Sequence, residues 1–558
     1  MIPFDFRTNK GYQYMLLGLY LLMNGLMLAL EVPDIVYYKF AQRRSGVGEF
    51  NLAGDFVRLL PGFIKDYWYL WILLISLIWL MWFLYKIAYW KDLKRKMSFK
   101  YQLLIFLFTI GLSLIGARGG LQLRPITPVG AGLQLKDSRL IPLATNTSIN
   151  FVFSFQQKAL KEDNFFSDKQ LDSLFTLKRN VSNGQTFRPM NVVVLIIESL
   201  STEYTLKQHD GKIYTPFFDS LSQHSLHFER SYANAQRSAQ GIVAITSGLP
   251  ALMEEPFQFS PYQSNQLEGI ASCLKKKGYT SGFFHGSNPG SMDFERFAAI
   301  TGYDNFYDKT KFNNDELYDG NWGIWDIPFF QWTLAQLDKY PKPFFCTMFS
   351  LTSHSPFHVE KWFEKQYPNE DPMLRSVRYT DEALRRFFKT ASTMDWYNNT
   401  LFVISADHTG LTINDNFKNK EGLFRIPIIF YCPDSNVISR AMSNEANKSV
   451  MSQIDIFPTI LDFLHFDQDF HCFGKSILDK THKYTYQYNN GIYQILDGEY
   501  ILLFDGANVV GMYDYRNDPL LRRDIKLEHD SKTKELSDNL KAVVQRYKRA
   551  MIRNELNK

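Results

Sequence analysis

The sequence predicts an α/β domain with a mainly parallel sheet, preceded by an α-helical transmembrane region. Long uncharged segments fill much of the first 120 residues. From Met190 to about Tyr515, strand-like runs alternate with helical patterns, which is typical of βαβ units and parallel sheets. Six consecutive aliphatic residues, Val192 to Ile197, indicate a strand that is buried on both faces.

Residues 1–120 contain three uncharged segments, at about 11–30, 67–85 and 101–117. As helices, each is long enough to cross the roughly 30 Å hydrocarbon layer of a bilayer, the third only barely. A signal peptide is not indicated, because further spans follow the first segment and no small-residue cleavage pattern does. Buried helices of a soluble protein remain the alternative to three transmembrane helices.

The orientation in the membrane follows from basic residues between the second and third segments. That short segment has only one acidic residue, Asp92. Its basic residues are Lys86, Lys91, Lys94, Arg95, Lys96 and Lys100. The positive-inside rule makes such a loop cytoplasmic. Three basic residues in the first external loop, Lys39, Arg43 and Arg44, weaken this assignment slightly. We therefore predict a multi-pass protein of the cell (inner/cytoplasmic) membrane whose large domain, after Ala117, is extracytoplasmic.

Composition excludes several classes of protein. The 62 basic and 57 acidic residues give a net charge of only +5, which does not support nucleic-acid binding. The hydrophobic fraction of 45% excludes a disordered chain. The four cysteines form no C-x-x-C pair, so a zinc ribbon or a disulfide scaffold is not indicated; they are Cys273, Cys346, Cys432 and Cys472.

Residues 121–189 separate the membrane segments from the α/β domain. Proline and glycine turns come first, followed by helical patterns at Ile141–Lys161 and Ser167–Leu177. The apolar periodicity favours linker helices over a flexible spacer. We expect extracytoplasmic linker helices that lie on the membrane surface and pack against the next domain.

The α/β domain is expected to span 190–515 and to end in a small antiparallel meander. The meander strands are predicted at Tyr484–Tyr488, Gly491–Leu496 and Tyr500–Phe504. Residues 516–558 form a C-terminal helical segment, with an amphipathic charged helix from Lys532 to Lys558.

Strand-like runs end repeatedly in side chains that can bind metals or transfer protons. Ligands of open α/β sheets bind outside the carboxyl ends of the strands. A carboxylate placed there is costly unless it is paired or binds a metal. A single residue of this kind would be interpreted as a solvated side chain at the end of a strand. Its repetition at several strand ends instead indicates the rim of an active site. The runs deliver Glu198, His285, His354 and the pair Asp407–His408.

A further candidate lies between the first two of these runs. Polar and small residues around Ser238 lead into an apolar helical run, which places Ser238 at or near a helix N-terminus. Free N–H groups and the helix dipole favour an anion there, and Arg237 adds a permanent positive charge. The alternative is that Ser238 merely caps the helix.

Several motifs in order resemble one family, the lipoteichoic acid synthase-like phosphoglycerol transferases of the alkaline phosphatase superfamily. The motifs are Ile-Ile-Glu198-Ser, Gln-Arg-Ser238-Ala-Gln-Gly, Phe-Phe-His285-Gly, Leu-Thr-Ser-His354-Ser-Pro-Phe and Ser-Ala-Asp407-His408-Thr-Gly. Further matches lie at 302–308, 321–326 and 425–431, and the likeness extends from about Arg118 to the end. It implies an alkaline phosphatase/sulfatase-like fold for the α/β domain. Relatives usually carry five spans rather than three, which leaves a truncated amino terminus open.

The resemblance implies a metal centre and a nucleophile. It makes Glu198, Asp407 and His408 ligands of one divalent ion, and Ser238 the nucleophile that also binds this ion. The family more often has threonine at that position, and serine supports the same chemistry. Two carboxylates and one imidazole lean towards hard ions, so Mn²⁺ is favoured over Mg²⁺ or Zn²⁺.

The resemblance also implies a headgroup site. His285 and His354 fall where the family places histidines around the phosphate and headgroup, and one of them would protonate the leaving alkoxide. Arg296 matches the headgroup-phosphate arginine, and Phe294 stands where tryptophan is usual. The spacing from His285 to Arg296 is about two residues longer than expected, so the resemblance does not decide which headgroup is bound.

We therefore predict a membrane-anchored, metal-dependent phosphotransferase. It would move a phosphoglycerol-type headgroup from a phospholipid to a hydroxyl of a glycan, lipid or polymer, through a phosphoserine-type intermediate. A phosphoethanolamine transferase is one alternative, although such enzymes are usually richer in cysteine. A sulfatase-type hydrolase is another, but the Cys/Ser-x-Pro-x-Arg run of sulfatases is missing. A non-catalytic membrane protein that kept the fold is the third.

Overall fold

The computed structural model describes residues 10–41, 62, 64–92, 98–118, 147, 148, 151, 160–182, 184–206, 211–263, 265–443, 449–479 and 481–558. The chain folds into two compact units, residues 1–157 and 158–558.

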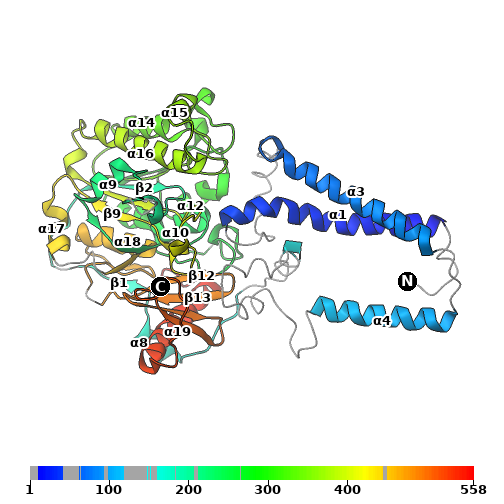
Figure 1. Cartoon of the computed structure of the whole chain (residues 1–558). Helices are drawn as coiled ribbons and strands as arrows, with labels where there is room; N and C mark the ends of the chain where they lie inside the picture. The colour runs from blue at the N-terminus through cyan, green and yellow to red at the C-terminus, as the bar shows by residue number, and fades with distance from the viewer. Residues whose placement is uncertain are drawn as a thin grey trace. The chain divides into compact units, whose positions relative to one another are not determined.

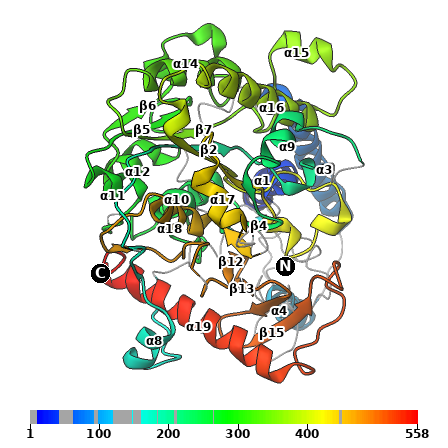
Figure 2. The same cartoon turned by 90° about the vertical axis from the view of Figure 1, so that its left-hand side faces the viewer.

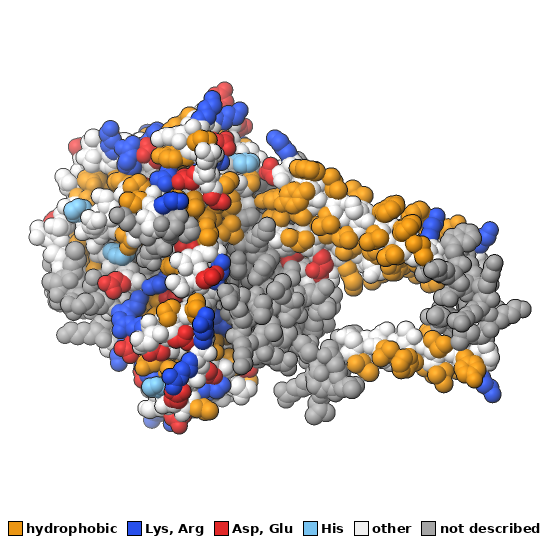
Figure 3. All heavy atoms as spheres, viewed as in Figure 1, with side chains coloured by type: hydrophobic (Ala, Val, Ile, Leu, Met, Phe, Trp, Pro, Cys, Tyr) orange, Lys and Arg blue, Asp and Glu red, His pale blue; other side chains and the backbone are white. Residues whose placement is uncertain are grey.

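The first unit contains three long apolar helices (Figure 1). They are α1 (Lys10–Ala41), α3 (Trp68–Asp92) and α4 (Phe99–Arg118). Each includes a window long and apolar enough to cross a membrane, by length and composition. Their apolar side chains face outward (Figure 3), and Trp79 is 58% exposed. An outward apolar surface is the reverse of a soluble core and suits contact with lipid.

Two sequence predictions fall largely outside the described residues. The predicted helix at Ile141–Lys161 is described only at a few positions, and most of the basic loop between α3 and α4 is not described, since 93–97 lie outside. The cytoplasmic placement of that loop therefore stays a prediction.

The second unit is built on a seven-stranded sheet in the order β3-β9-β8-β2-β7-β5-β6. The strands β2, β5, β6, β7 and β8 pair in parallel, whereas β9 is antiparallel to its neighbours β8 and β3. The predicted mainly parallel α/β sheet is confirmed. The strands are β2 (Asn191–Ile197), β3 (Leu226–His227), β5 (Thr280–His285), β6 (Asn305–Tyr307), β7 (Phe344–Phe349), β8 (Thr400–Ala406) and β9 (Ile428–Tyr431).

Helices cover both faces of this sheet (Figures 1 and 2). One face carries α14 (Asp326–Leu337) and α16 (Pro372–Ala391), and the other carries α10 (Ser238–Ser247) and α18 (Gln453–Phe463). The central strand β2 is buried over its whole length for this reason. Its aliphatic run needs no polar alternation, because neither face meets water.

Shorter elements complete the second unit. They are α9 (Pro216–Ser222), α11 (Ile270–Lys275), α12 (Phe294–Ile300), α13 (Lys309–Phe312), α15 (Lys361–Gln366), α17 (Asn436–Ser443), β4 (Arg230–Tyr232) and β10 (Val450–Ser452). The strands β4 and β10 pair in parallel outside the main sheet.

A second, four-stranded antiparallel sheet lies near the C-terminus. The three predicted meander strands correspond to β12 (Thr485–Asn489), β13 (Ile492–Leu496) and β14 (Tyr500–Phe504). A fourth strand, β15 (Val509–Asp514), extends the meander and was not predicted. The C-terminal helix α19 (Asp530–Arg553) packs against this sheet.

Residues 160–179, here called the strap, run along α19. The strap contains one short helix, α8 (Asp168–Leu174), and the strand β1 (Lys178–Arg179), which pairs with β11 (Phe470–His471). Four ion pairs join it to α19. They are Glu162–Arg553, Asp163–Lys548, Asp168–Arg549 and Asp172–Arg546.

Candidate active site

Glu198 and Asp407 follow two neighbouring strands directly. In the parallel pairing of β2 with β8, Asn191 lies opposite Thr400 and Ile197 opposite Ala406. The next residue of each strand is therefore a carboxylate, and the two emerge side by side at the carboxyl edge of the sheet. Both are buried, with 1% and 0% of their surfaces exposed.

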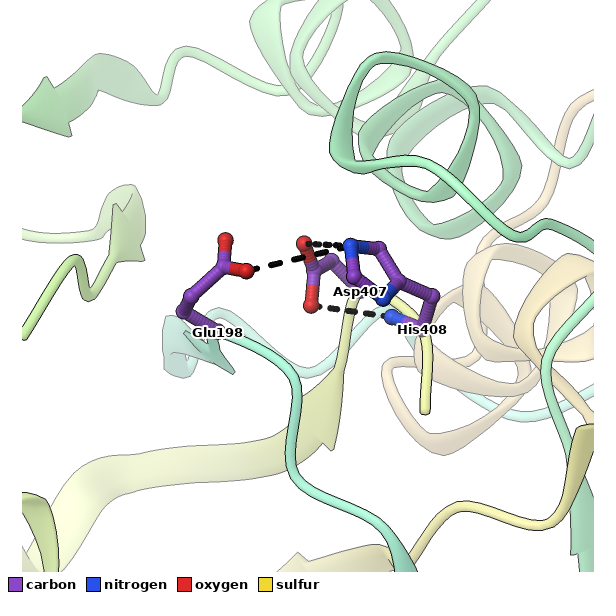
Figure 4. Close-up of side chains that lie close together, drawn as sticks. All are labelled: Glu198, Asp407 and His408. Atoms are coloured by element: carbon purple, nitrogen blue, oxygen red, sulfur yellow. Dashed lines mark hydrogen bonds and ion pairs between the residues drawn. The ribbon is translucent and has the colours of Figure 1, made fainter. Parts of the chain in front are cut away.

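His408 completes a cluster with these carboxylates (Figure 4). One ligand atom from each of the three side chains lies within 4.8 Å of the others, and the side chains point toward one another. Nε2 of His408 is 3.3 Å from Oδ2 of Asp407 and 3.8 Å from Oε1 of Glu198. Within the described part of the chain, Oδ2 of Asp407 accepts no hydrogen bond.

The tautomer of His408 follows from its other ring nitrogen. Nδ1 lies 2.8 Å from the carbonyl oxygen of Thr409, which can only accept, so Nδ1 carries the proton. A neutral ring then directs the lone pair of Nε2 at two carboxylates. Such an arrangement of acceptors is repulsive unless a cation or a proton lies among them.

Electrostatics supports the same conclusion. Burial, and then the nearby Glu198, raise the pKa of Asp407 to about 7. Burial opposes a charge on His408, but the two carboxylates outweigh burial and raise its pKa. The donor set of two carboxylates and a free imidazole nitrogen therefore fits a divalent metal ion, which would compensate both negative charges.

Ser238 lies beside this cluster as the first residue of α10. Its hydroxyl donates to Oε2 of Glu198 over 3.3 Å, and its Oγ lies 3.4 Å from Nε2 of His408. Arg237 occupies the N-cap position, and no side chain there makes a capping hydrogen bond. The hydroxyl is thus directed at the cluster rather than at the helix backbone.

Gly241 explains how α10 comes so close to the end of β8. A Cβ atom at this position would lie 2.1 Å from the carbonyl oxygen of Asp407, so only glycine fits. The side chain of Gln453 donates to the carbonyl oxygens of Ala406 and Asp407 at 2.8 and 2.7 Å. Neither residue was predicted as part of the site, although the Ser-Ala-Gln-Gly run contains Gly241.

Three serines that the sequence analysis missed hold Glu198. Ser199 donates its hydroxyl to Oε1 of Glu198 at 2.6 Å. Ser350 accepts the backbone N–H of Glu198, and the hydroxyl of Ser353 donates to its carbonyl oxygen at 2.6 Å. Ser350 and Ser353 follow β7, so the serine-rich end of that strand was the available signal.

His354 lies in the same loop as Ser353 and within the electrostatic influence of the cluster. Nδ1 donates to the carbonyl oxygen of Ser355 over 2.9 Å. Burial lowers the pKa of His354 to about 4, so the ring is neutral at neutral pH and its Nε2 is an acceptor. A neutral imidazole in this tautomer accepts a proton rather than supplying one.

His285 and Phe294 lie in an aromatic core. The His285 ring stacks on Phe349 at 5.1 Å between centroids and meets Phe294 edge-on. Burial lowers the pKa of His285 to about 3, and among described residues neither ring nitrogen has a hydrogen-bond partner. Phe294 is 0% exposed. The structure thus places Phe294 in the core, where a headgroup cannot contact it in this conformation.

Arg296 is bound by residues outside the cluster. Its guanidinium donates to Asp293 at 2.6 Å, to the backbone of Gln258 at 2.8 Å and to the side chain of Gln263 at 2.7 Å. The longer spacing noted in the sequence forms a tight loop, in which Gly290, Met292 and Asp293 all have positive φ. That loop turns Asp293 onto Arg296, so the structure does not join this arginine to the metal-type cluster.

Part of the second unit matches a known family model. The Sulfatase family model matches residues 190–466. Lipoteichoic acid synthase 2 of Bacillus subtilis is 25% identical over 371 residues, which cover 62% of this chain and 56% of that protein. The lipoteichoic acid synthase of Staphylococcus aureus strain NCTC 8325 matches with the same identity and coverage. The chain spans a little over half the length of these curated relatives.

Solved structures agree on the fold. A protein of the alkaline phosphatase superfamily from Vibrio parahaemolyticus has a TM-score of 0.59 at 23% identity, covering 70% of this chain and 98% of that one. The lipoteichoic acid synthase LtaP from Listeria monocytogenes has a TM-score of 0.58 at 18% identity, covering 70% and 99%. The predicted resemblance is confirmed: residues 190–466 match the Sulfatase family model, and the fold is like that of the solved alkaline phosphatase superfamily protein.

Proposed function

We propose that the protein is a membrane-anchored, metal-dependent phosphotransferase. It moves a phosphoglycerol-type headgroup from a phospholipid to an acceptor hydroxyl. The observation that carries the proposal is the convergence of Glu198, Asp407, His408 and the Ser238 hydroxyl. Within the described residues, no lysine or arginine forms an ion pair with either carboxylate. The similarity to lipoteichoic acid synthases supports this type of transfer.

Glu198, Asp407 and His408 would hold the metal ion, with the Ser238 hydroxyl beside them. When bound, the ion supplies positive charge that lowers the pKa of an alcohol and screens the charge of a phosphate. Mn²⁺ is favoured over Mg²⁺ and Zn²⁺, because oxygen ligands outnumber the single imidazole.

Ser238 attacks the phosphorus of the donor lipid. A bond forms between Oγ and phosphorus, and the bond from phosphorus to the diacylglycerol oxygen breaks. The hydroxyl proton of Ser238 leaves toward Oε2 of Glu198, the acceptor it already faces. The diacylglycerol alkoxide takes up a proton from water and departs, and the headgroup stays on Ser238 as a phosphodiester. The N-terminus of α10 favours the phosphate charge at this position.

The second half returns Ser238 to its free form. An acceptor hydroxyl attacks phosphorus, the bond to Oγ breaks, and Oγ regains the proton that Glu198 took up in the first half. Nε2 of His354 is suited to accept the proton of the incoming hydroxyl, because the ring is neutral with Nδ1 occupied. His285 and Phe294 are buried and Arg296 is paired with Asp293. Their proposed roles at the headgroup require a rearrangement on binding.

The membrane helices fit a lipid donor. Three helices that could span a bilayer precede the catalytic unit in the chain. The basic loop before α4 favours an extracytoplasmic catalytic domain at the cell membrane. We propose phosphatidylglycerol ahead of phosphatidylethanolamine as donor, and a glycan, lipid or polymer as acceptor.

A donor assay tests this function. The purified full chain with Mn²⁺ is incubated with phosphatidylglycerol or phosphatidylethanolamine, each labelled in its acyl chains, and released diacylglycerol is measured. We expect release from phosphatidylglycerol by the parent and none by Ser238→Ala. Release from phosphatidylethanolamine alone would instead identify a phosphoethanolamine transferase. Hydrolysis of sulfate esters without lipid cleavage would identify a sulfatase.

A further inference from the structure

Trp322 packs directly on His354. The two ring centroids are 3.8 Å apart with an interplanar angle of 39°. The residues belong to different loops, one before α14 and one after β7. Trp322 is partly exposed, so the contact lies at the border between core and site.

One carbonyl oxygen serves both side chains. The backbone oxygen of Ser355 accepts Nε1–H of Trp322 at 2.7 Å and Nδ1–H of His354 at 2.9 Å. A carbonyl has two acceptor lone pairs, and here both are used. The arrangement keeps the proton of His354 on Nδ1 and the lone pair on Nε2.

The loop that carries Trp322 is held by hydrogen bonds and close packing. Oδ1 of Asp319 accepts the backbone N–H groups of Asn321, Trp322 and Gly323 at 2.8, 2.8 and 3.1 Å. A Cβ atom at Gly323 would lie 2.7 Å from the backbone carbonyl oxygen of Gly286, so the loop fits against its neighbour only with glycine. These contacts fix the backbone that carries the indole.

The loop of His354 is hydrogen-bonded to the first residue of α14, which directly follows the loop of Trp322. Oδ1 of Asp326, the first residue of α14, accepts the N–H groups of Leu351 and Thr352 at 2.8 and 3.2 Å. Asp326 follows Trp322 by four residues, and Thr352 precedes His354 by two. The two loops are thus joined both at the indole and at this carboxylate.

We propose that Trp322 is a positioning residue for His354 and acts through the shared Ser355 carbonyl. It holds Nε2 of His354 ready to accept a proton from a substrate hydroxyl, so the inference rests on the proposed phosphotransfer. Packing alone would not require an indole N–H, and the Nε1 hydrogen bond is what distinguishes positioning from packing. Preorganised proton acceptors raise turnover rather than substrate affinity.

A matched pair of variants tests the proposal. Trp322→Phe keeps an aromatic ring over His354 and removes the N–H donor together with one of the two fused rings of the indole. Trp325 lies in the same segment, and among described residues its Nε1 has no hydrogen-bond partner, so Trp325→Phe is the control. We expect kcat to fall about 10-fold or more in Trp322→Phe with an unchanged KM for the donor, and little change in the control.

A double-mutant cycle separates action through His354 from general damage. In a His354→Ala background, Trp322→Phe is expected to have no further effect on kcat, because the residue that it positions is gone. Parent-like kcat in Trp322→Phe, or additive losses in the double variant, would overturn the inference. An active Ser238→Ala would instead refute the proposed function, so the two failures are distinguishable.

Discussion

The cluster of Glu198, Asp407 and His408 and the strap on α19 both gather charged side chains, but they do so in opposite ways. In the strap, each of the four acidic residues meets a lysine or an arginine, and Asp168 and Asp172 have side chains that are 75% and 68% exposed. In the cluster, Glu198 and Asp407 are almost fully buried and share one imidazole, that of His408.

The pKa shifts in the two regions have opposite signs. The hydrogen bond and charge of Arg549 hold the pKa of Asp168 below its usual value. Burial, together with Glu198, raises the pKa of Asp407 to about 7. Opposite charges on a surface compensate each other and carry little energy. Like charges that are buried together lack a partner, and this marks the cluster rather than the strap as the functional site.

The largest expected effect comes from the nucleophile. Ser238→Ala removes one hydroxyl and should lower headgroup transfer by about 1,000-fold or more, because no other group in the proposed reaction can bond to phosphorus. Ser247→Ala, at the other end of α10, removes an equally buried hydroxyl and should leave transfer unchanged. Release of labelled diacylglycerol measures both variants. A Ser238→Ala enzyme with full turnover would point to a water nucleophile.

The second-largest expected effect is on metal affinity, which should change in the cluster and not in the strap. Asp407→Asn removes one charged side chain of the proposed ligand set and should weaken Mn²⁺ binding by more than about 100-fold, which exceeds the loss typical of residues behind the ligands. Asp168→Asn removes a carboxylate of the strap and should leave Mn²⁺ affinity unchanged. Titration calorimetry on the full chain measures both. Equal affinities in the parent and Asp407→Asn would place the metal elsewhere.

The pH dependence of stability should differ between a buried carboxyl group, that of Asp381, and the exposed carboxyl group of Asp168 in the strap. Asp381 accepts the backbone N–H groups of Phe217 and Phe218, and burial raises its pKa to about 7. Between about pH 4 and 7 the folded protein keeps a proton that the unfolded chain has released. The free energy of unfolding therefore falls as pH rises through this window, by at most about 1.4 kcal/mol per pH unit from this group.

Asp168 has the opposite sign. Its lowered pKa contributes stability above about pH 4, and this contribution is lost as pH falls through the lowered pKa. Urea unfolding of the full chain in detergent, at several pH values, measures both effects. Asp381→Asn should flatten the fall between pH 4 and 7, whereas Asp168→Asn should leave that window unchanged. An Asp381→Asn profile parallel to that of the parent would refute this assignment.

The smallest effect should come from breaking one strap ion pair. Lys548→Gln removes the partner of Asp163, and both side chains are only partly buried. We expect a loss of at most about 1 kcal/mol in the free energy of unfolding and unchanged headgroup transfer. A large loss of transfer would show that the strap controls the catalytic cluster.

Local patterns predicted the sheet and a rim of candidate side chains, and the family resemblance selected the cluster among them. The aliphatic run of β2 indicates a buried parallel strand, and the carboxyl ends of such strands meet at one edge. Glu198, Asp407 and His408 therefore converge as the sequence suggested. Their roles in catalysis stay predictions.

Contacts between distant residues could not be predicted in this way. Arg296 turns to Asp293 because of a loop with left-handed residues, and helix residue Phe294 contacts Phe349 at the end of strand β7. The Ser355 carbonyl joins Trp322 to His354 across separate loops. None of these contacts has a periodic signature in the sequence.

The central claim is that the headgroup is bonded to Ser238 during transfer. The most direct test incubates the full chain and Mn²⁺ with phosphatidylglycerol labelled in its headgroup glycerol, without acceptor, followed by an acid quench and peptide mass spectrometry. We expect the label on the peptide that contains Ser238, and none in Ser238→Ala. Diacylglycerol release from phosphatidylglycerol with an unmodified Ser238 peptide would contradict the account.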